Sequence, residues 1–205
     1  MKMNHLNELQ DIGVYLKVNK MLLGNAGNIS VREKDGFLIS ASGSFLDKLT
    51  EKTVCFCDME GNYEGKKPSK EFLLHKCIYE KRKDINCVIH CSPFYATMIG
   101  CMDINFQKNL FVESMYYLKS LKEIAFANPG SKELVDLIDE VCLKTNVILM
   151  KHHGVLVYGE TIEKVKMILT VLEVCAKMNI LGKDGLVEVE EKSVSCFLNE
   201  SGYKK

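Results

Sequence analysis

The chain has 205 residues, and its 27 Lys and Arg residues balance its 27 Asp and Glu residues, so its formal net charge is zero. This length predicts a single domain over residues 1–205 with room for a substantial core. A neutral chain has no strong field to attract nucleic acid or an anionic membrane, and we expect neither as a partner.

The cysteine count and the first residues bear on location. Nine cysteines are an odd number, and residues 1–5 lack the apolar core of a signal peptide. We therefore expect reduced thiols and a cytoplasmic protein. The longest apolar stretch, residues 165–181, is shorter than the roughly 20 residues that a membrane span needs, and it contains Lys166, Glu173 and Lys177.

The first half of the chain alternates between regular elements and loops of small residues. Apolar side chains at helical spacing over residues 4–23 predict an amphipathic helix. Residues 24–28 follow with two glycines and two asparagines, which predict a tight loop with exposed backbone. Ser42 and Gly43 lie in a second such loop. Alternating polarity predicts strands at residues 29–32, 36–40 and 53–58.

The central stretch, residues 67–92, joins a helix to a strand. Pro68 ends an extended run, and Ser69 is expected to cap the helix that follows. Three apolar residues then form a short buried strand that ends in His90. Glu71 opens the helix and His90 closes the strand, and two such groups can meet at one end of a layered α/β fold, where ligands usually bind.

The second half predicts further helices and strands. Helices are expected at residues 94–101, from the cap Ser131 to about 143, and from the cap Thr161 to about 181. Strands are expected at residues 147–150 and 155–158, with short strands also within 103–130. The charged tail after residue 182 supports no prediction of an element. The whole is one α/β domain with a largely antiparallel central sheet.

Small-residue loops of this kind can hold an anion. Backbone N–H groups at residues 24–28 and at Ser42-Gly43, beside a helix start at Ser69, would form a phosphate pocket with Lys70 as its cation. Each loop taken singly is equally well a turn.

Two histidines next to strands have the chemistry of metal ligands. A single histidine at a strand end is more often a hydrogen-bonded structural residue. His90 and His153 together with Glu71 would fit a catalytic divalent metal with an open position. His75 follows Glu71 by four positions and shares its helix face, so it either orients the carboxylate or packs in the core.

Several segments resemble the class II aldolase/adducin family in their order and spacing. They are Gly24-Asn25-Ala26-Gly27-Asn28-Ile29-Ser30-Val31-Arg32, Ser42-Gly43, Lys67-Pro68-Ser69-Lys70-Glu71, Leu74-His75, Ile78-Tyr79, Val88-Ile89-His90 and His152-His153-Gly154. The resemblance implies a three-layer α/β/α fold and a homotetramer with its active sites at subunit interfaces. It also implies a sugar phosphate as the substrate.

The resemblance also implies roles for individual residues. The family's zinc is held by three histidines, two from a His-x-His at a strand end and one before a glycine; His90 and His153 match the first and the third. Glu71 matches the acid/base. The phosphate would lie against a set of small residues, namely Asn25, Asn28, Ser42, Gly43 and Ser69, beside the cation Lys70.

Three positions depart from the family pattern. Ser92 stands where the second histidine of His-x-His belongs, and a neutral hydroxyl is a poor zinc ligand. Lys70 replaces a serine, and Asn25 replaces a threonine. A proton-donating tyrosine has no secure match, with Tyr116, Tyr117 and Tyr203 as the candidates.

The resemblance predicts a metal-dependent lyase that cleaves a ketose 1-phosphate to dihydroxyacetone phosphate and an aldehyde. Dehydration of a methylthioribulose-type phosphate would use the same pocket. Ser92 also leaves open a metal-free binding or scaffold domain.

Overall fold

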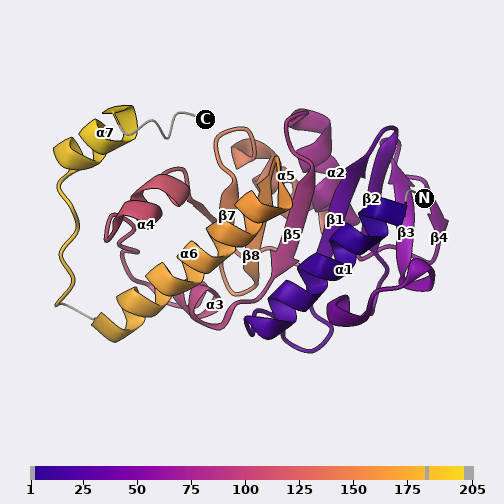
Figure 1. The fold of residues 1–205 in the computed structure, drawn as a ribbon, viewed down its shortest axis with the longest axis horizontal. Coiled ribbons are helices and arrows are strands. Elements are labelled where there is room, and N and C mark those ends of the chain that lie inside the picture. Colours follow the sequence, from indigo (N-terminus) through magenta and orange to yellow (C-terminus); the bar gives the residue numbers. More distant parts are fainter. Residues whose placement is uncertain (1–2, 183–184, 201–205) are drawn as a thin grey trace.

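The architecture is a single mixed sheet with helices on both faces (Figure 1). The computed structural model describes residues 3–182 and 185–200. The eight strands, in the spatial order β4-β3-β2-β1-β5-β8-β7-β6, pair antiparallel except for β6 and β7, which are parallel. They are β1 (Asn28–Glu33), β2 (Gly36–Ser40), β3 (Val54–Asp58), β4 (Tyr63–Gly65), β5 (Cys87–Cys91), β6 (Lys122–Ile124), β7 (Val147–Met150) and β8 (Gly154–Gly159).

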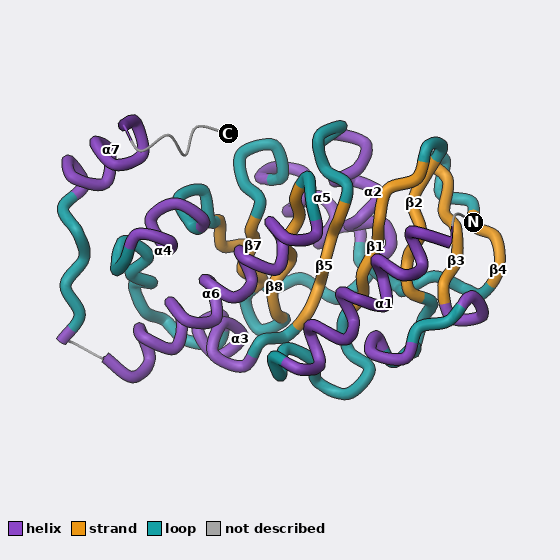
Figure 2. The backbone as a smooth tube through the Cα atoms, in the orientation of Figure 1, coloured by secondary structure: helices purple, strands orange, loops and turns teal. Residues whose placement is uncertain are grey.

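The helices form the two outer layers of the fold. They are α1 (Met3–Val18), α2 (Phe72–Lys81), α3 (Phe94–Gly100), α4 (Val112–Tyr117), α5 (Lys132–Val141), α6 (Ile162–Gly182) and α7 (Glu191–Glu200), with short 3-10 turns at Leu46–Lys48 and Glu51–Thr53. In the tube view, α1 and α6 cross the front of the sheet while α2 and α5 lie behind it (Figure 2). The predicted three-layer fold with a largely antiparallel sheet is confirmed.

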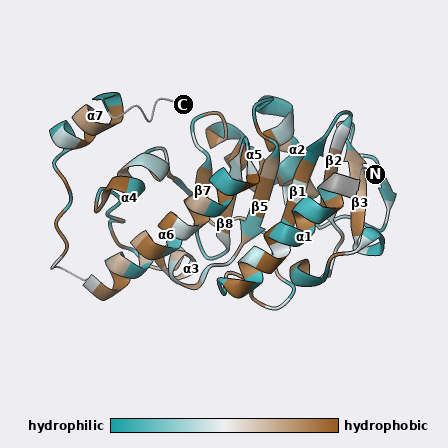
Figure 3. Ribbon diagram, viewed as in Figure 1, coloured by the Kyte–Doolittle hydropathy of each residue, from teal (hydrophilic) through white to brown (hydrophobic). Residues whose placement is uncertain are grey.

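Side-chain alternation in the strands divides the core into two apolar clusters. In β5, Ile89 faces the cluster that contains α1, α3 and α6, whereas Val88 faces the cluster that contains α2 and α5. The central strands are accordingly coloured as largely apolar in Figure 3. His90 follows Val88 by two positions and therefore lies on the α2 side of the sheet. No helix in the described part of the chain is long and apolar enough to cross a bilayer.

Several predicted element boundaries are confirmed by the capping contacts. The Ser131 hydroxyl accepts a hydrogen bond from the Leu134 amide at 3.1 Å, and the Thr161 hydroxyl accepts one from the Lys164 amide at 3.1 Å. The two strands on either side of residues 151–153 are also where the sequence placed them.

Other boundaries differ from the prediction. The first helix ends at Val18 instead of residue 23, because Lys20 adopts a left-handed conformation (φ 58°) and the Met21 amide bonds back to the Leu16 carbonyl at 2.9 Å. The residue directly before α2 is Glu71, two positions after the predicted cap Ser69, whose hydroxyl accepts a hydrogen bond from the Glu71 amide at 3.3 Å.

Two segments contain helices that the sequence did not predict. Residues 103–130 hold α4 as well as the short strand β6. The tail forms α7, which the preceding Glu188 carboxylate anchors by accepting hydrogen bonds from the amides of Lys108 and Asn109 at 2.9 and 2.8 Å. Figure 1 shows α7 beside α4, at the end of the molecule farthest from α1.

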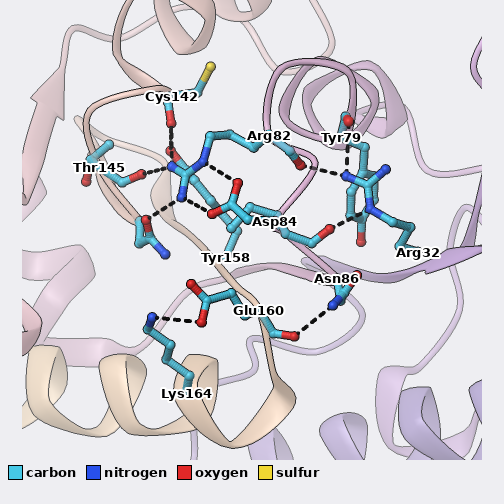
Figure 4. A network of polar contacts seen from close by, with 12 residues as sticks. Arg32, Tyr79, Arg82, Asp84, Asn86, Cys142, Thr145, Tyr158, Glu160 and Lys164 are labelled. Atoms are coloured by element: carbon cyan, nitrogen blue, oxygen red, sulfur yellow. Dashed lines mark hydrogen bonds and ion pairs between the residues drawn. The ribbon is translucent and has the colours of Figure 1, made fainter. Parts of the chain in front are cut away.

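Arg82 fixes the connection that leads into β5 (Figure 4). Its guanidinium donates to the carbonyls of Cys142 and Thr145, each at 3.1 Å, and forms a two-point contact with the Asp84 carboxylate at 2.8 and 2.6 Å. The loop after α2 is thereby tied to the loop after α5.

Arg32 makes a second tie at the same end of β5. It donates to the carbonyls of Ile85, Tyr79 and Arg82 at 2.6, 3.0 and 2.7 Å. Two of these acceptors lie at the C-terminus of α2, where carbonyls lack helical partners. These hydrogen bonds tie the end of α2 and the loop before β5 to β1, the strand whose pairing with β5 places Asn28 opposite His90.

Candidate active site

Three side chains that the sequence singled out converge at the C-terminal end of β5. Glu71 precedes α2, His90 lies in β5, and His153 lies in the turn between β7 and β8. One ligand atom from each lies within 4.8 Å of the others. Glu71 Oε2 is 3.3 Å from His90 Nε2, and Glu71 Oε1 is 3.1 Å from His153 Nε2.

The sheet sets both the direction and the tautomer of His90. Its Nδ1 lies 3.0 Å from the Val155 carbonyl oxygen, which can only accept, so Nδ1 carries the proton. In the neutral ring Nε2 is then a bare lone pair that points at Glu71.

His153 is aimed by an unusual turn. His152, the residue before it, has φ 55° in the left-handed region, which is uncommon for residues other than glycine. The His153 amide then bonds to the Met150 carbonyl at 3.1 Å and closes the turn. His152 itself is exposed, so only one of the two neighbouring histidines reaches the site.

Two glycines allow loops to pack directly on the end of β5. Gly27 has φ 94°, and a Cβ there would lie 2.6 Å from the His90 carbonyl oxygen. Gly154 has φ 149°, and a Cβ there would lie 2.7 Å from the Cys91 carbonyl oxygen. Both positions exclude any other residue, because the close approach leaves no room for a side chain.

The electrostatics of the cluster leave Glu71 ionised and His90 neutral. Glu71 is only 7% exposed, and this burial opposes ionisation. The hydrogen bond with His153, the nearby imidazoles of His90 and His153 and the amide of Asn28 outweigh burial and lower the pKa of Glu71 to about 2. Burial lowers the pKa of His90, against the opposing effect of the Glu71 carboxylate.

This donor set fits a divalent cation. The His90 Nε2 lone pair faces the Glu71 carboxylate at 3.3 Å, and two such groups repel unless a cation lies between them. Glu71 Oε1 is buried and lies 3.1 Å from His153 Nε2, its ion-pair partner. Two imidazole nitrogens and a carboxylate are a common ligand set for catalytic zinc.

Ser92 lies beside this cluster. Its hydroxyl oxygen is 3.2 Å from the point that a Cβ of Gly154 would occupy, and His90 Cε1 is 3.3 Å from the same point. The hydroxyl is therefore a neighbour of the His90 ring. Its role as a metal ligand stays a prediction.

The loops predicted to hold phosphate are brought together. The side-chain amide of Asn25 donates to the Gly43 carbonyl at 3.4 Å, which joins the first loop to the second. The Ser69 amide donates to the Ser40 carbonyl at 3.3 Å, which joins the third segment to the second. Gly43 has φ 75° and open space around its Cα, and Lys70 is exposed.

Asn28 lies deeper than the other residues of this set. It is 2% exposed, and its side-chain amide donates to Glu71 Oε2 at 3.0 Å. Its contact in the structure is thus with the predicted acid/base. The phosphate contact that the sequence suggested for Asn28 stays a prediction.

The candidate tyrosines lie away from the cluster within one chain. Tyr116 and Tyr117 line a hollow of about 640 Å³ together with Arg82, whose loop leads into the opposite end of β5. Neither lies beside Glu71 in the same subunit. Tyr203 lies outside the described residues.

Comparisons with known proteins agree with this geometry. Residues 7–180 match the model of the family described as Class II Aldolase and Adducin N-terminal domain. The chain belongs to the class II aldolase and adducin family. Class II aldolases use a divalent metal, and the cluster of Glu71, His90 and His153 is a group of side chains that could hold one.

Individual relatives in the family point to sugar-phosphate chemistry. An L-fuculose phosphate aldolase of Methanococcus maripaludis is 30% identical over 162 residues, which are 79% of this chain and 88% of the relative. A 3-oxo-tetronate 4-phosphate decarboxylase of Haemophilus influenzae is 33% identical over 144 residues, 67% of this chain and 68% of that protein. The solved structure of YgbL from Klebsiella pneumoniae, 21% identical, has a TM-score of 0.86 and is covered to 96%, with 94% of this chain aligned, and it supports the fold alone.

Proposed function

We propose that the protein is a metal-dependent aldolase that cleaves a ketose 1-phosphate, such as L-fuculose 1-phosphate, to dihydroxyacetone phosphate and an aldehyde. The observation that carries the proposal is the convergence of a buried carboxylate and two imidazoles beside the three joined loops. The L-fuculose phosphate aldolase relatives support the choice of substrate class.

The proposed cofactor is zinc, held by His90, His153 and Glu71, with Ser92 as a weak additional ligand. When bound, a divalent metal supplies Lewis-acid polarisation of the substrate's oxygens. His90 reaches this position already in the required tautomer, because its Nδ1 proton is held by Val155.

Glu71 is the proposed acid/base of the cleavage. When the bond between C3 and C4 of the ketose breaks, the C4 hydroxyl loses its proton as the aldehyde forms, and C3 gains a proton to complete dihydroxyacetone phosphate. A side chain that moves a proton at C3 must be ionised at the start of a cycle in the synthesis direction, and Glu71 meets this condition.

The proposed phosphate site is the set of joined loops. Asn25, Ser42, Gly43 and Ser69 supply short side chains and backbone groups, and the exposed Lys70 supplies a positive charge. We also propose a homotetramer in the cytoplasm. The nine free cysteines, seven of which are buried, agree with a reducing compartment.

The experiment is a cleavage assay with the purified chain. Ketose 1-phosphates, L-fuculose 1-phosphate among them, are supplied with zinc, manganese or a chelator, and dihydroxyacetone phosphate is measured by its enzymatic reduction. Metal-dependent release is expected, and Glu71→Gln, which keeps the shape of the side chain, is expected to abolish it. Absence of release from every ketose phosphate with every metal would overturn the proposal.

A second candidate is decarboxylation of a 3-oxo sugar-acid phosphate. The observation that favours it is the 33% identity to the Haemophilus influenzae decarboxylase. Both reactions break a carbon–carbon bond next to a carbonyl, so the same cluster would serve. Release of carbon dioxide from 3-oxo-tetronate 4-phosphate, without dihydroxyacetone phosphate from any ketose 1-phosphate, would select this function.

A further inference from the structure

An unbroken chain of hydrogen bonds runs through the core to Glu71. The Tyr79 hydroxyl is 2.8 Å from Ser30 Oγ, which is 2.6 Å from His75 Nδ1. His75 Nε2 is 2.5 Å from Asn28 Oδ1, and Asn28 Nδ2 is 3.0 Å from Glu71 Oε2. None of these five residues is more than 7% exposed, and Tyr79, Ser30 and His75 are fully buried.

The Glu71 carboxylate at the end of this chain fixes which atom is the donor and which the acceptor in every hydrogen bond. The Glu71 carboxylate can only accept, so the Asn28 NH₂ group must face it. Asn28 Oδ1 therefore faces His75, whose Nε2 must carry the proton. His75 Nδ1 then accepts from the Ser30 hydroxyl, and Ser30 Oγ accepts from Tyr79. Burial also lowers the pKa of His75 to about 3, in agreement with a neutral ring.

The fixed amide decides how Glu71 presents its two oxygens. Backbone pairing places Asn28 opposite His90 across β1 and β5, so the side chain of Asn28 is the part that remains free to rotate. A rotated amide would set its oxygen against the Glu71 carboxylate and its NH₂ group against the Nε2 proton of His75, so both hydrogen bonds would be lost. With His75 as donor, both ends of the amide favour one orientation, which engages Oε2 and leaves Oε1 beside His153.

We propose that His75 is a positioning residue that acts through Asn28 on Glu71. The imidazole locks the Asn28 amide, and the amide locks the carboxylate in the orientation that metal binding and proton transfer require. The catalytic consequence rests on the proposed function, whereas the positioning itself does not.

The direct test is the tautomer of His75 in the metal-free wild-type protein, measured by long-range ¹H–¹⁵N NMR. We expect the proton on Nε2 and a slowly exchanging Asn28 side-chain NH₂ group. A proton on Nδ1 would overturn the proposal. This measurement needs no substrate, so it decides the question even if no ketose phosphate is cleaved.

A pair of variants separates positioning from packing. His75→Leu fills much of the volume without a donor, whereas His75→Gln keeps an N–H group near the position of Nε2. We expect His75→Leu to weaken zinc binding and lower kcat by about 10- to 100-fold, with KM changed less, and His75→Gln to recover a large part of both. His5→Gln, at a histidine near Arg32 and the opposite end of β5, is the control. Equal zinc affinity in the wild type and both His75 variants would contradict the inference.

Discussion

At the scale of single residues, the ability of the site to bind a cation depends on which side-chain atoms carry no proton. His90 donates a hydrogen bond from Nδ1 to the Val155 carbonyl, and Glu71 stays ionised although it is buried. Ser92 contributes a neutral hydroxyl beside them, where the family pattern has a histidine. The proposed metal centre would therefore have one strong ligand fewer than the family pattern.

The Ser92→His substitution tests that interpretation. Because residue 92 lies next to the His90 ring, an added imidazole is expected to tighten zinc binding at least tenfold, equivalent to about 1.4 kcal/mol. Affinity is measured by competition with a zinc-binding dye. Ser120→His, which adds a histidine beside the hollow lined by Arg82, is the control. Unchanged affinity in Ser92→His would show that residue 92 does not face the metal.

The sequence predicted Glu71, His90 and His153 as a group because their spacing and family motifs are local signals. The contact of Asn28 with Glu71 could not be predicted from the sequence in the same way. Asn28 and Ser30 share one face of β1 by simple alternation, but their partners on α2 lie more than 40 positions away. Only the position of α2 against the sheet reveals those contacts.

At the scale of elements, the start of α2 shows how tertiary pairing overrides a local cap signal. Ser69 has the right side chain for a cap, yet its amide pairs with the Ser40 carbonyl and its neighbour Pro68 forms a bridge with Ala41. The backbone stays extended to this point, and the helix begins later. Glu71 consequently stands at the helix entrance, pointing into the site.

The other end of α2 carries a testable contact. Arg32 reaches three carbonyls with one planar guanidinium, and a lysine in its place can satisfy only part of this set. Arg32→Lys is expected to lower the free energy of unfolding by about 2–3 kcal/mol, since hydrogen bonds from a charged donor are among the stronger ones. Urea unfolding measures the change.

Lys34→Gln, in the exposed turn after β1, is the matched control and is expected to stay within about 0.5 kcal/mol of the wild type. If Arg32→Lys lowers the free energy of unfolding by less than about 0.5 kcal/mol, Arg32 does not hold the connection into β5.

At the scale of the whole molecule, the two apolar clusters place the neutral imidazoles of His75 and His90 inside the fold. The layered architecture was predictable from the order of helices and strands. The helices α4 and α7 were not, because both are short and bury few side chains: Ser114 and Met115 in α4, and Val194 in α7.

Buried neutral histidines make stability depend on pH. The pKa of His75 is lowered to about 3 and that of His90 is also lowered, so below about pH 6.5 the unfolded chain takes up protons that the folded chain does not. The stability they contribute is complete above pH 6.5 and is lost as the pH falls. The carboxylate of Glu71 titrates lower, between its ordinary range and about pH 2, and adds little in this window.

The unfolding free energy of the metal-free protein is therefore expected to fall by roughly 1–3 kcal/mol between pH 7 and pH 5.5. Urea unfolding at a series of pH values measures the slope. The slope of the unfolding free energy against pH reports the number of protons taken up on unfolding. His75→Gln is expected to lower that number by up to one, whereas His5→Gln, at the partly exposed partner of Glu33, is expected to change it less. A slope that is the same in His75→Gln as in the wild type would contradict a neutral buried His75.

The central claim is that Glu71, His90 and His153 bind one metal ion together. The most direct measurement is the zinc stoichiometry and affinity of the chelator-treated chain, by equilibrium dialysis with elemental analysis, for the wild type and for Glu71→Gln, His90→Gln and His153→Gln. We expect one zinc per chain, with affinity lowered at least tenfold by each substitution. Wild-type protein that binds no zinc, or variants that bind it as tightly as the wild type, would show that these three side chains do not form a metal site.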